Sequence, residues 1–188
     1  MSNPFGPEAI KEVVETEIKE KIEMESITIE KMDMKIKIER CGFLPRTGGE
    51  WSGDAGDSDW YPDPEVEPGD RNGTNPEHKT WEEIMEEYGF ESIPFKDGQP
   101  DFSEVSKGEV EIDDFTDDRD SNFSQADEKL AEQRGCTPEE VAKWREENKY
   151  TWHECKDCKT MQKVPTEVHG NIPHSGGVSE YKSQKQSA

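Results

Sequence analysis

Hydrophobic residues recur at helical spacing near the start of the chain and then change period. Ile10, Val13, Val14, Ile18 and Ile22 lie on one face of a helix predicted over residues 7–24, with Pro7 in its first turn. Over residues 25–40, hydrophobic residues largely alternate with polar ones, which favours a strand. The high Glu and Lys content of that stretch leaves a helix open. We interpret residues 1–40 as an N-terminal adaptor or the remnant of a larger carrier.

The middle of the chain alternates between loop signals and helix signals. Residues 46–80 are rich in Gly, Pro, Asp and Asn, which predicts mostly loop. Helices are predicted over 80–89, with Thr80 and Glu83 as a capping box, over 122–134, and over 137–147 with Pro138 in the first turn. Asp97-Gly98 marks a turn, and "GEVEI" is typical of a short strand.

The C-terminal pattern is strand, tight hairpin, strand and short helix. "YTWHEC" and "KTMQKV" read as strands joined by a predicted two-residue turn at Lys156-Asp157, and "PTEVHGNI" reads as a helix beginning at Pro165. The predicted class is α+β, with an irregular, loop-rich and helical upstream part and a ββα-metal finger at about 148–178. Residues 41–188 would form one domain that ends in this finger.

Three of the four histidines fall on this frame: His153 on the first strand, and His169 and His174 on and after the helix. A ββα finger can hold one divalent metal beside a phosphate, while a strand histidine takes a proton from water. Imidazole suits that task because its ordinary pKa lies near 6.5. His78 lies in a polar loop and is expected to be a solvated side chain.

Cys155 and Cys158 form half of a zinc-knuckle pattern. With His169 and His174 they could instead build a structural zinc site in a non-enzymatic binding module. No second CxxC accompanies them, so an inert or redox-sensitive hairpin pair is the competing interpretation.

Charge and hydropathy change what the chain could bind. The net charge is −22, hydrophobic residues are 29% and charged residues 36%, so we do not expect every residue to pack. Residues 1–146 hold 17 Lys and Arg against 40 acidic residues, whereas the rest is nearly neutral. A nuclease with this balance needs its metal and a few local cations, and Lys156, Lys159 and Lys163 are the candidates for phosphate contact.

Neither a Sec signal peptide nor a transmembrane segment is expected, because the N-terminus has no basic region before an apolar stretch and no apolar run reaches about 18 residues. The protein is therefore expected to be cytoplasmic as made, with no membrane partner.

The segments "TWHE", "KTMQKVP" and "EVHGNIPHSGG" resemble the WHH branch of the HNH/endonuclease VII superfamily. The resemblance covers residues 148–182 closely, and extends more weakly upstream through "GEWSGDAGDSDW" and "FSQADEKLAEQRG". It implies the toxin module of a bacterial polymorphic toxin system: an endonuclease that uses one divalent metal (Mg, Mn, Ni or Zn) and acts on DNA more than on RNA. It also implies a cognate immunity protein and delivery into a target cell as part of a larger toxin.

Carried over by position, His153 matches the first His of the family's Trp-His-His strand, and His169 and His174 match its metal ligands. Glu154 stands where the family has its second His. The resemblance leaves the division between base and ligand open; we favour His153 as base and Glu154 as ligand or orienting group. Ala55 replaces a family Arg, which leaves Arg46, Arg71 and Arg119 as candidates for that phosphate contact. A degenerate nuclease that binds without cutting is a further alternative.

Overall fold

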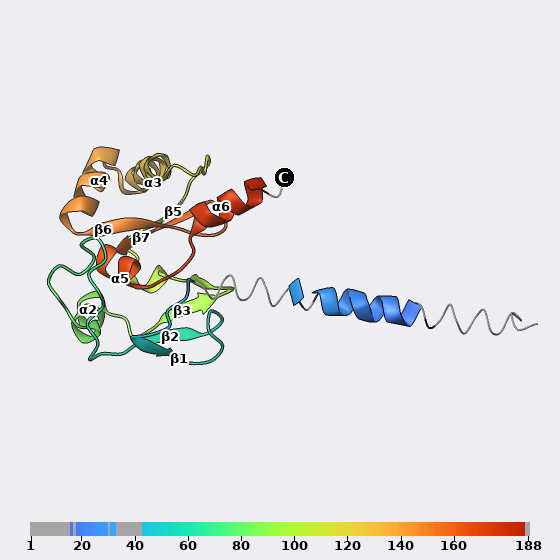
Figure 1. Ribbon diagram of the computed structural model, residues 1–188. Helices are drawn as coiled ribbons and strands as arrows, with labels where there is room; N and C mark the ends of the chain where they lie inside the picture. The colour runs from blue at the N-terminus through green and yellow to red at the C-terminus, as the bar shows by residue number, and fades with distance from the viewer. Residues whose placement is uncertain (1–15, 17, 30, 33–42, 187–188) are drawn as a thin grey trace, which may run out of the picture. The chain divides into compact units, whose positions relative to one another are not determined.

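The computed structural model describes residues 16, 18–29, 31–32 and 43–186 (Figure 1). Contacts divide the chain into two units, Met1–Gly42 and Phe43–Ala188. In the first unit, residues 16, 18–29, 31 and 32 are helical. The strand favoured for residues 25–40 is therefore wrong over 25–29 and 31–32, where the helix that the Glu and Lys content left open is found; residues 33–40 and 7–15 lie outside the described part.

The second unit is α+β, as predicted. Its elements are β1 (Gly49–Trp51), β2 (Asp59–Pro62), α2 (Trp81–Tyr88), β3 (Ile93–Lys96), β4 (Gln99–Pro100), a 3₁₀ turn η1 (Ser103–Val105), β5 (Glu109–Glu111), α3 (Arg119–Arg134), α4 (Pro138–Glu147), β6 (Tyr150–Glu154), β7 (Thr160–Pro165), α5 (Thr166–Asn171) and α6 (Gly177–Gln186). They form two antiparallel sheets, ordered β1-β2-β3-β4 and β5-β7-β6. None of the described helices is long and apolar enough to cross a membrane.

Two of the predicted helices, α2 and α4, have the N-caps that the sequence indicated. Thr80 and Glu83 form both halves of the capping box of α2, and Gly89 closes that helix in the left-handed conformation. Thr137 caps α4 in the same way, with Pro138 in its first turn. Asp97 and Gly98 both have positive φ between β3 and β4, which confirms the predicted turn.

The hairpin between β6 and β7 differs from the prediction. Five residues, 155–159, separate the two strands instead of two, and Cys158 adopts a positive φ of 55°. Asp157 organises the turn, because its carboxylate accepts hydrogen bonds from the backbone N–H groups of Lys159 (3.0 Å) and Thr160 (2.8 Å).

One hydrophobic cluster joins the β5-β7-β6 sheet to α3 and α4, which cover one of its faces, while α5 lies on the other (Figure 1). Trp152 on β6 lies in this cluster at 1% exposure, and its indole N–H donates to the Asp127 carboxylate of α3 over 2.8 Å. The members of the cluster are Val110, Ile112, Phe115, Ala126, Leu130, Ala131, Val141, Trp152 and Met161. The cluster therefore fixes the position of the β5-β7-β6 sheet, whose strand β6 carries His153.

Candidate metal centre and active site

Strand β6 separates its side chains between two layers. Because side chains alternate along a strand, Trp152 and Glu154 face α3, whereas His153 faces the opposite side, where α5 packs. His153 pairs in register with Gln162 of β7, whose amide oxygen accepts from the backbone N–H of Phe102. This hydrogen bond joins β7, the strand next to His153, to the segment after β4 that contains Phe102.

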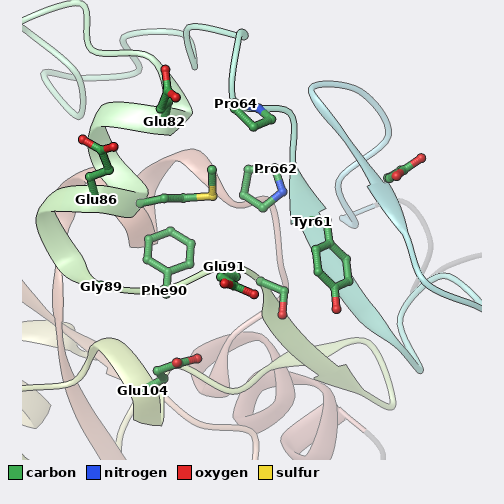
Figure 2. A pocket seen from close by; sticks show the side chains of 12 residues that line it. Tyr61, Pro62, Pro64, Glu82, Glu86, Gly89, Phe90, Glu91 and Glu104 are labelled. Carbon is green, nitrogen blue, oxygen red and sulfur yellow. The ribbon is translucent and has the colours of Figure 1, made fainter.

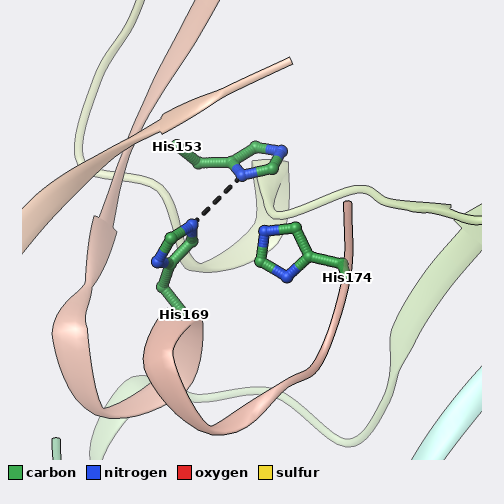
Figure 3. A group of neighbouring side chains, drawn as sticks. All are labelled: His153, His169 and His174. Carbon is green, nitrogen blue, oxygen red and sulfur yellow. Dashed lines mark hydrogen bonds between the residues drawn. The ribbon is translucent and has the colours of Figure 1, made fainter. Parts of the chain in front are cut away.

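Three histidines converge at the junction of β6, α5 and the segment after α5 (Figure 3). One ring nitrogen of each of His153, His169 and His174 lies within 4.8 Å of the other two. His153 Nδ1 lies 3.2 Å from His169 Nε2. Phe102 packs against all three rings, with centroid separations of 5.0, 5.6 and 5.5 Å, and so shields one side of the group from water.

The hydrogen bond of His174 decides which of its nitrogens is available. Nδ1 lies 2.7 Å from the carbonyl oxygen of Ile172, and because a carbonyl only accepts, Nδ1 carries the proton. The lone pair is therefore on Nε2. A backbone carbonyl that orients a histidine through one nitrogen while the other faces a cation is a common arrangement around metals.

Burial holds the three imidazoles neutral. It lowers the pKa of His153 and His169 well below 6.5 and that of His174 to about 4, and the mutual proximity of the rings lowers the pKa of His153 and His169 further. His153 Nε2 is buried and has no hydrogen-bond partner among the described residues. His153 Nδ1 and His169 Nε2 face each other beside the His174 ring, and this arrangement fits a metal site, since three neutral imidazoles supply three donors.

Glu154 is held apart from this group. Its carboxylate accepts from the Asn122 amide over 2.8 Å and pairs with the Arg119 guanidinium over 3.2 Å, and both partners belong to α3. Burial raises the pKa of Glu154, while Asn122 and Arg119 oppose that shift. The expectation that Glu154 joins His169 and His174 as a metal ligand is not matched by the geometry; the third member of the described group is His153, because alternation turns Glu154 toward α3.

The histidines and Glu154 nevertheless line one cavity of about 390 Å³. Arg119 lies on its wall from α3, and Arg71 lies on its wall from the loop before α2. Arg46, the third arginine considered for phosphate contact, is not among the lining residues. Further lining residues are Asn72, Thr74, Trp152, Gly170, Ile172, Pro173, Gly176 and Ser179. Gly176 thus lies at the cavity, and Gly177 begins α6.

The three candidate lysines are not gathered at this cavity. Lys156 donates to the Asp97 carbonyl over 3.0 Å, and Lys159 pairs with Glu111 over 2.5 Å. Lys163 is fully buried beneath Trp144, with its Nζ 4.2 Å from the ring centroid. A surface phosphate contact by Lys163 is therefore wrong: the residue pairs with Trp152 across β6 and β7 and so faces the α3–α4 layer.

The two hairpin cysteines do not join the histidines. Both are free thiols, and in the described part of the chain the one group suited to a metal contains neither. Burial raises the pKa of Cys155 to about 12, and burial likewise raises the pKa of Cys158, so both thiols stay protonated. The arrangement of the described residues does not favour a structural zinc site on Cys155, Cys158, His169 and His174.

Phe102, Asn122 and Thr74 are residues of the site that the sequence did not reveal, whereas Arg71 was already a candidate for phosphate contact. Each reaches the site through contacts with residues at least 32 positions away, such as Asn122 with Glu154. The only local signal is a polar Asn inside a helix that is otherwise expected to bury apolar side chains, and such a residue often marks a buried hydrogen bond.

A larger hollow of about 880 Å³ lies between β2 and α2 (Figure 2). Tyr61, Met85 and Phe90 line it, together with five glutamates: Glu50, Glu82, Glu86, Glu91 and Glu104. No histidine or cysteine lines it. Because the glutamates would repel phosphate, this hollow is unsuited to a nucleic acid.

Comparison with known proteins bears on the segment that carries the histidines. Residues 92–176 match the family model of the DNase/tRNase domain of colicin-like bacteriocins. The matched segment contains the three histidines, Glu154, Arg119 and Phe102, and it excludes the loop with Arg71. A search of curated proteins finds no significant match. The family match supports a nuclease toxin domain in this part of the chain.

Proposed function

We propose that residues 41–188 are an HNH-type, metal-dependent endonuclease of the WHH branch, which hydrolyses phosphodiester bonds, of DNA in preference to RNA. The observation that carries the proposal is the group of three neutral histidines on a strand–hairpin–strand–helix frame, inside a segment that matches a nuclease family. We propose His153, His169 and His174 as the ligands of one divalent ion. When bound there, the ion would supply a positive charge to stabilise the phosphate and the departing 3′ oxygen.

Within this proposal His153 is a ligand, and Glu154 accepts the proton of the attacking water. His153 lies in the group of three histidines, so its ring would bind the ion and not take the proton of the water. Glu154 lines the same cavity from the opposite face of β6. Asn122 and Arg119 hold that carboxylate in place. This reverses the roles favoured for His153 and Glu154 on sequence grounds. Arg119, with 64% of its side chain exposed, can also face a phosphate oxygen.

The biological setting is also a proposal. The family match supports a toxin context, and we propose that this is a bacterial polymorphic toxin system with a cognate immunity protein. A net charge of −22 would steer a basic partner toward the nuclease. Residues 1–40 would act as an adaptor or carrier remnant, a role compatible with the division of the chain after Gly42.

The test is cleavage of supercoiled plasmid by purified protein after treatment with EDTA, with Mg²⁺, Mn²⁺, Ni²⁺ or Zn²⁺ added back. We expect metal-dependent nicking that is lost in His153→Ala. The matched control is His78→Ala, because His78 is exposed and pairs with Glu67 outside the cavity. Circular dichroism would establish that both variants fold. Lack of cleavage of plasmid and of an RNA substrate with every metal would refute the enzyme, and equal activity of the two variants would refute the site.

A further inference from the structure

The segment of residues 68–79, here called the Asn75 loop, lies outside the match to the nuclease family. It folds around one side chain. Asn75 is fully buried, and its amide donates to the carbonyls of Pro68 (3.0 Å) and Lys79 (2.9 Å) while accepting from the Lys79 N–H (3.0 Å). The Asp70 carboxylate accepts from the Asn75 N–H over 3.1 Å. These bonds give an otherwise irregular loop one conformation.

The Asn75 loop is fastened to α5, the helix that carries His169. The Thr74 hydroxyl donates to the Asn171 side-chain oxygen over 3.1 Å, and Lys79 Nζ lies 3.2 Å from the Glu167 carboxylate. The loop approaches the helix so closely that a Cβ at Gly170 would lie 2.9 Å from Thr74 Cβ. The Asn75 loop is thus packed closely against α5.

This docking brings Arg71 to the wall of the histidine cavity. The Arg71 backbone is tied to Thr74 by two hydrogen bonds, from Arg71 N to the Thr74 hydroxyl (3.1 Å) and from Thr74 N to the Arg71 carbonyl (3.3 Å). Its side chain is exposed, and no ion pair to it is found within residues 43–186. Arg119 also lines the cavity. Glu154 is the one carboxylate among the lining residues, and it is paired with Arg119.

The negative net charge of the chain makes a cation at the cavity important for attracting phosphate. At −22 the protein repels a polyanion at long range, so attraction of phosphate must come from cations close to the site. A guanidinium can hold two phosphate oxygens at once, with a geometry that an ammonium group does not reproduce. Arg71 is the cavity cation that is not engaged with a carboxylate of the described residues.

We propose that Arg71 is a substrate-binding residue that grips a backbone phosphate of the nucleic acid entering the histidine cavity. The inference rests on the proposed nuclease function and adds a phosphate subsite built by the Asn75 loop. Arg71 positions the strand and takes no part in proton transfer. Its loss therefore weakens substrate binding while the chemistry at the histidines continues.

The test measures kcat and KM for cleavage of a fluorescently labelled DNA duplex over a series of KCl concentrations. We compare wild type, Arg71→Ala, Arg71→Lys and Lys143→Ala. Lys143 on α4 is an equally charged control, because it is 73% exposed, pairs with Glu147 and does not line the cavity. Since both backbone ties of Arg71 survive truncation of its side chain, melting temperature should be unchanged.

Arg71→Ala should raise KM roughly tenfold at low salt with kcat within about twofold, as expected for losing one charged phosphate contact. The slope of log(kcat/KM) against log[KCl] should become shallower by about 0.9. Arg71→Lys should keep the slope and recover part of KM, and Lys143→Ala should match wild type. An Arg71→Ala enzyme with the slope and KM of Lys143→Ala, or with a lower kcat and melting temperature, overturns this inference. A wild type that cleaves with no metal overturns the proposed function first.

Discussion

Lys163 offers a quantitative test of how the β5-β7-β6 sheet packs on α3 and α4. Its ammonium group is fully buried over the Trp144 ring, and no hydrogen-bond partner is found among the described residues. Burial, followed by the charges of Arg134 and Arg145, lowers the pKa of Lys163 from 10.5 to about 8, although Asp127 and Cys136 oppose the shift. Each unit of pKa is worth about 1.4 kcal/mol, so holding this proton in the folded state costs about 3 kcal/mol.

The sign of the pH dependence follows from that shift. Below pH 8 both states carry the proton and the full cost is present; between pH 8 and 10.5 the unfolded chain still holds it and the folded chain does not, so stability rises with pH. Lys163→Met removes the buried charge and keeps an unbranched side chain of similar length. We therefore expect the variant to be more stable by about 3 kcal/mol at pH 7.

Urea unfolding at a series of pH values measures both quantities. The free-energy difference between Lys163→Met and wild type should fall by about 2–3 kcal/mol between pH 7 and pH 10. Lys159→Met is the control, because Lys159 is exposed and paired with Glu111, and its effect on stability should be small over the same pH range. A difference for Lys163→Met that is constant over this pH range would refute the buried, unpaired ammonium group.

Two further changes test the site and its support. Glu154→Gln keeps the shape and the Asn122 contact but removes the proposed proton acceptor, so plasmid cleavage should fall about 10²–10⁴-fold while metal binding persists; unchanged cleavage would remove Glu154 from the reaction. Asp127→Ala breaks a buried pair with Arg145 (3.0 Å) and leaves the Trp152 N–H unpaired, so urea unfolding should show a loss of about 3–5 kcal/mol. Asp113→Ala, which removes an exposed pair with Lys129, should cost much less stability than Asp127→Ala, and equal losses would contradict the role of burial.

Features written in neighbouring residues could be predicted from the sequence. The caps at Thr80 and Thr137, the turn at Asp97-Gly98 and the order of strand, strand and helix around the histidines depend on contacts within a few positions. The strand predicted from residue 25 is wrong over 25–29 and 31–32, because alternation over a short stretch competes with the helix preference of Glu and Lys.

Features that depend on distant contacts could not be predicted. Whether His153 or Glu154 faces the other histidines depends on which layer packs on each face of β6, and a shift of one residue would exchange them. The same packing buries Lys163, which resembles its exposed neighbours in sequence. Arg71 reaches the cavity only because Thr74 docks on Asn171, 97 residues away.

Metal titration of EDTA-treated protein by isothermal calorimetry tests the central claim most directly. Wild type should bind one Zn²⁺ or Ni²⁺ per chain, His169→Ala should bind at least about tenfold more weakly, and Cys155→Ser should match wild type, since the proposed ligands are His153, His169 and His174. Stoichiometric binding that survives in His169→Ala and is lost in Cys155→Ser would place the metal on the hairpin cysteines and contradict the account.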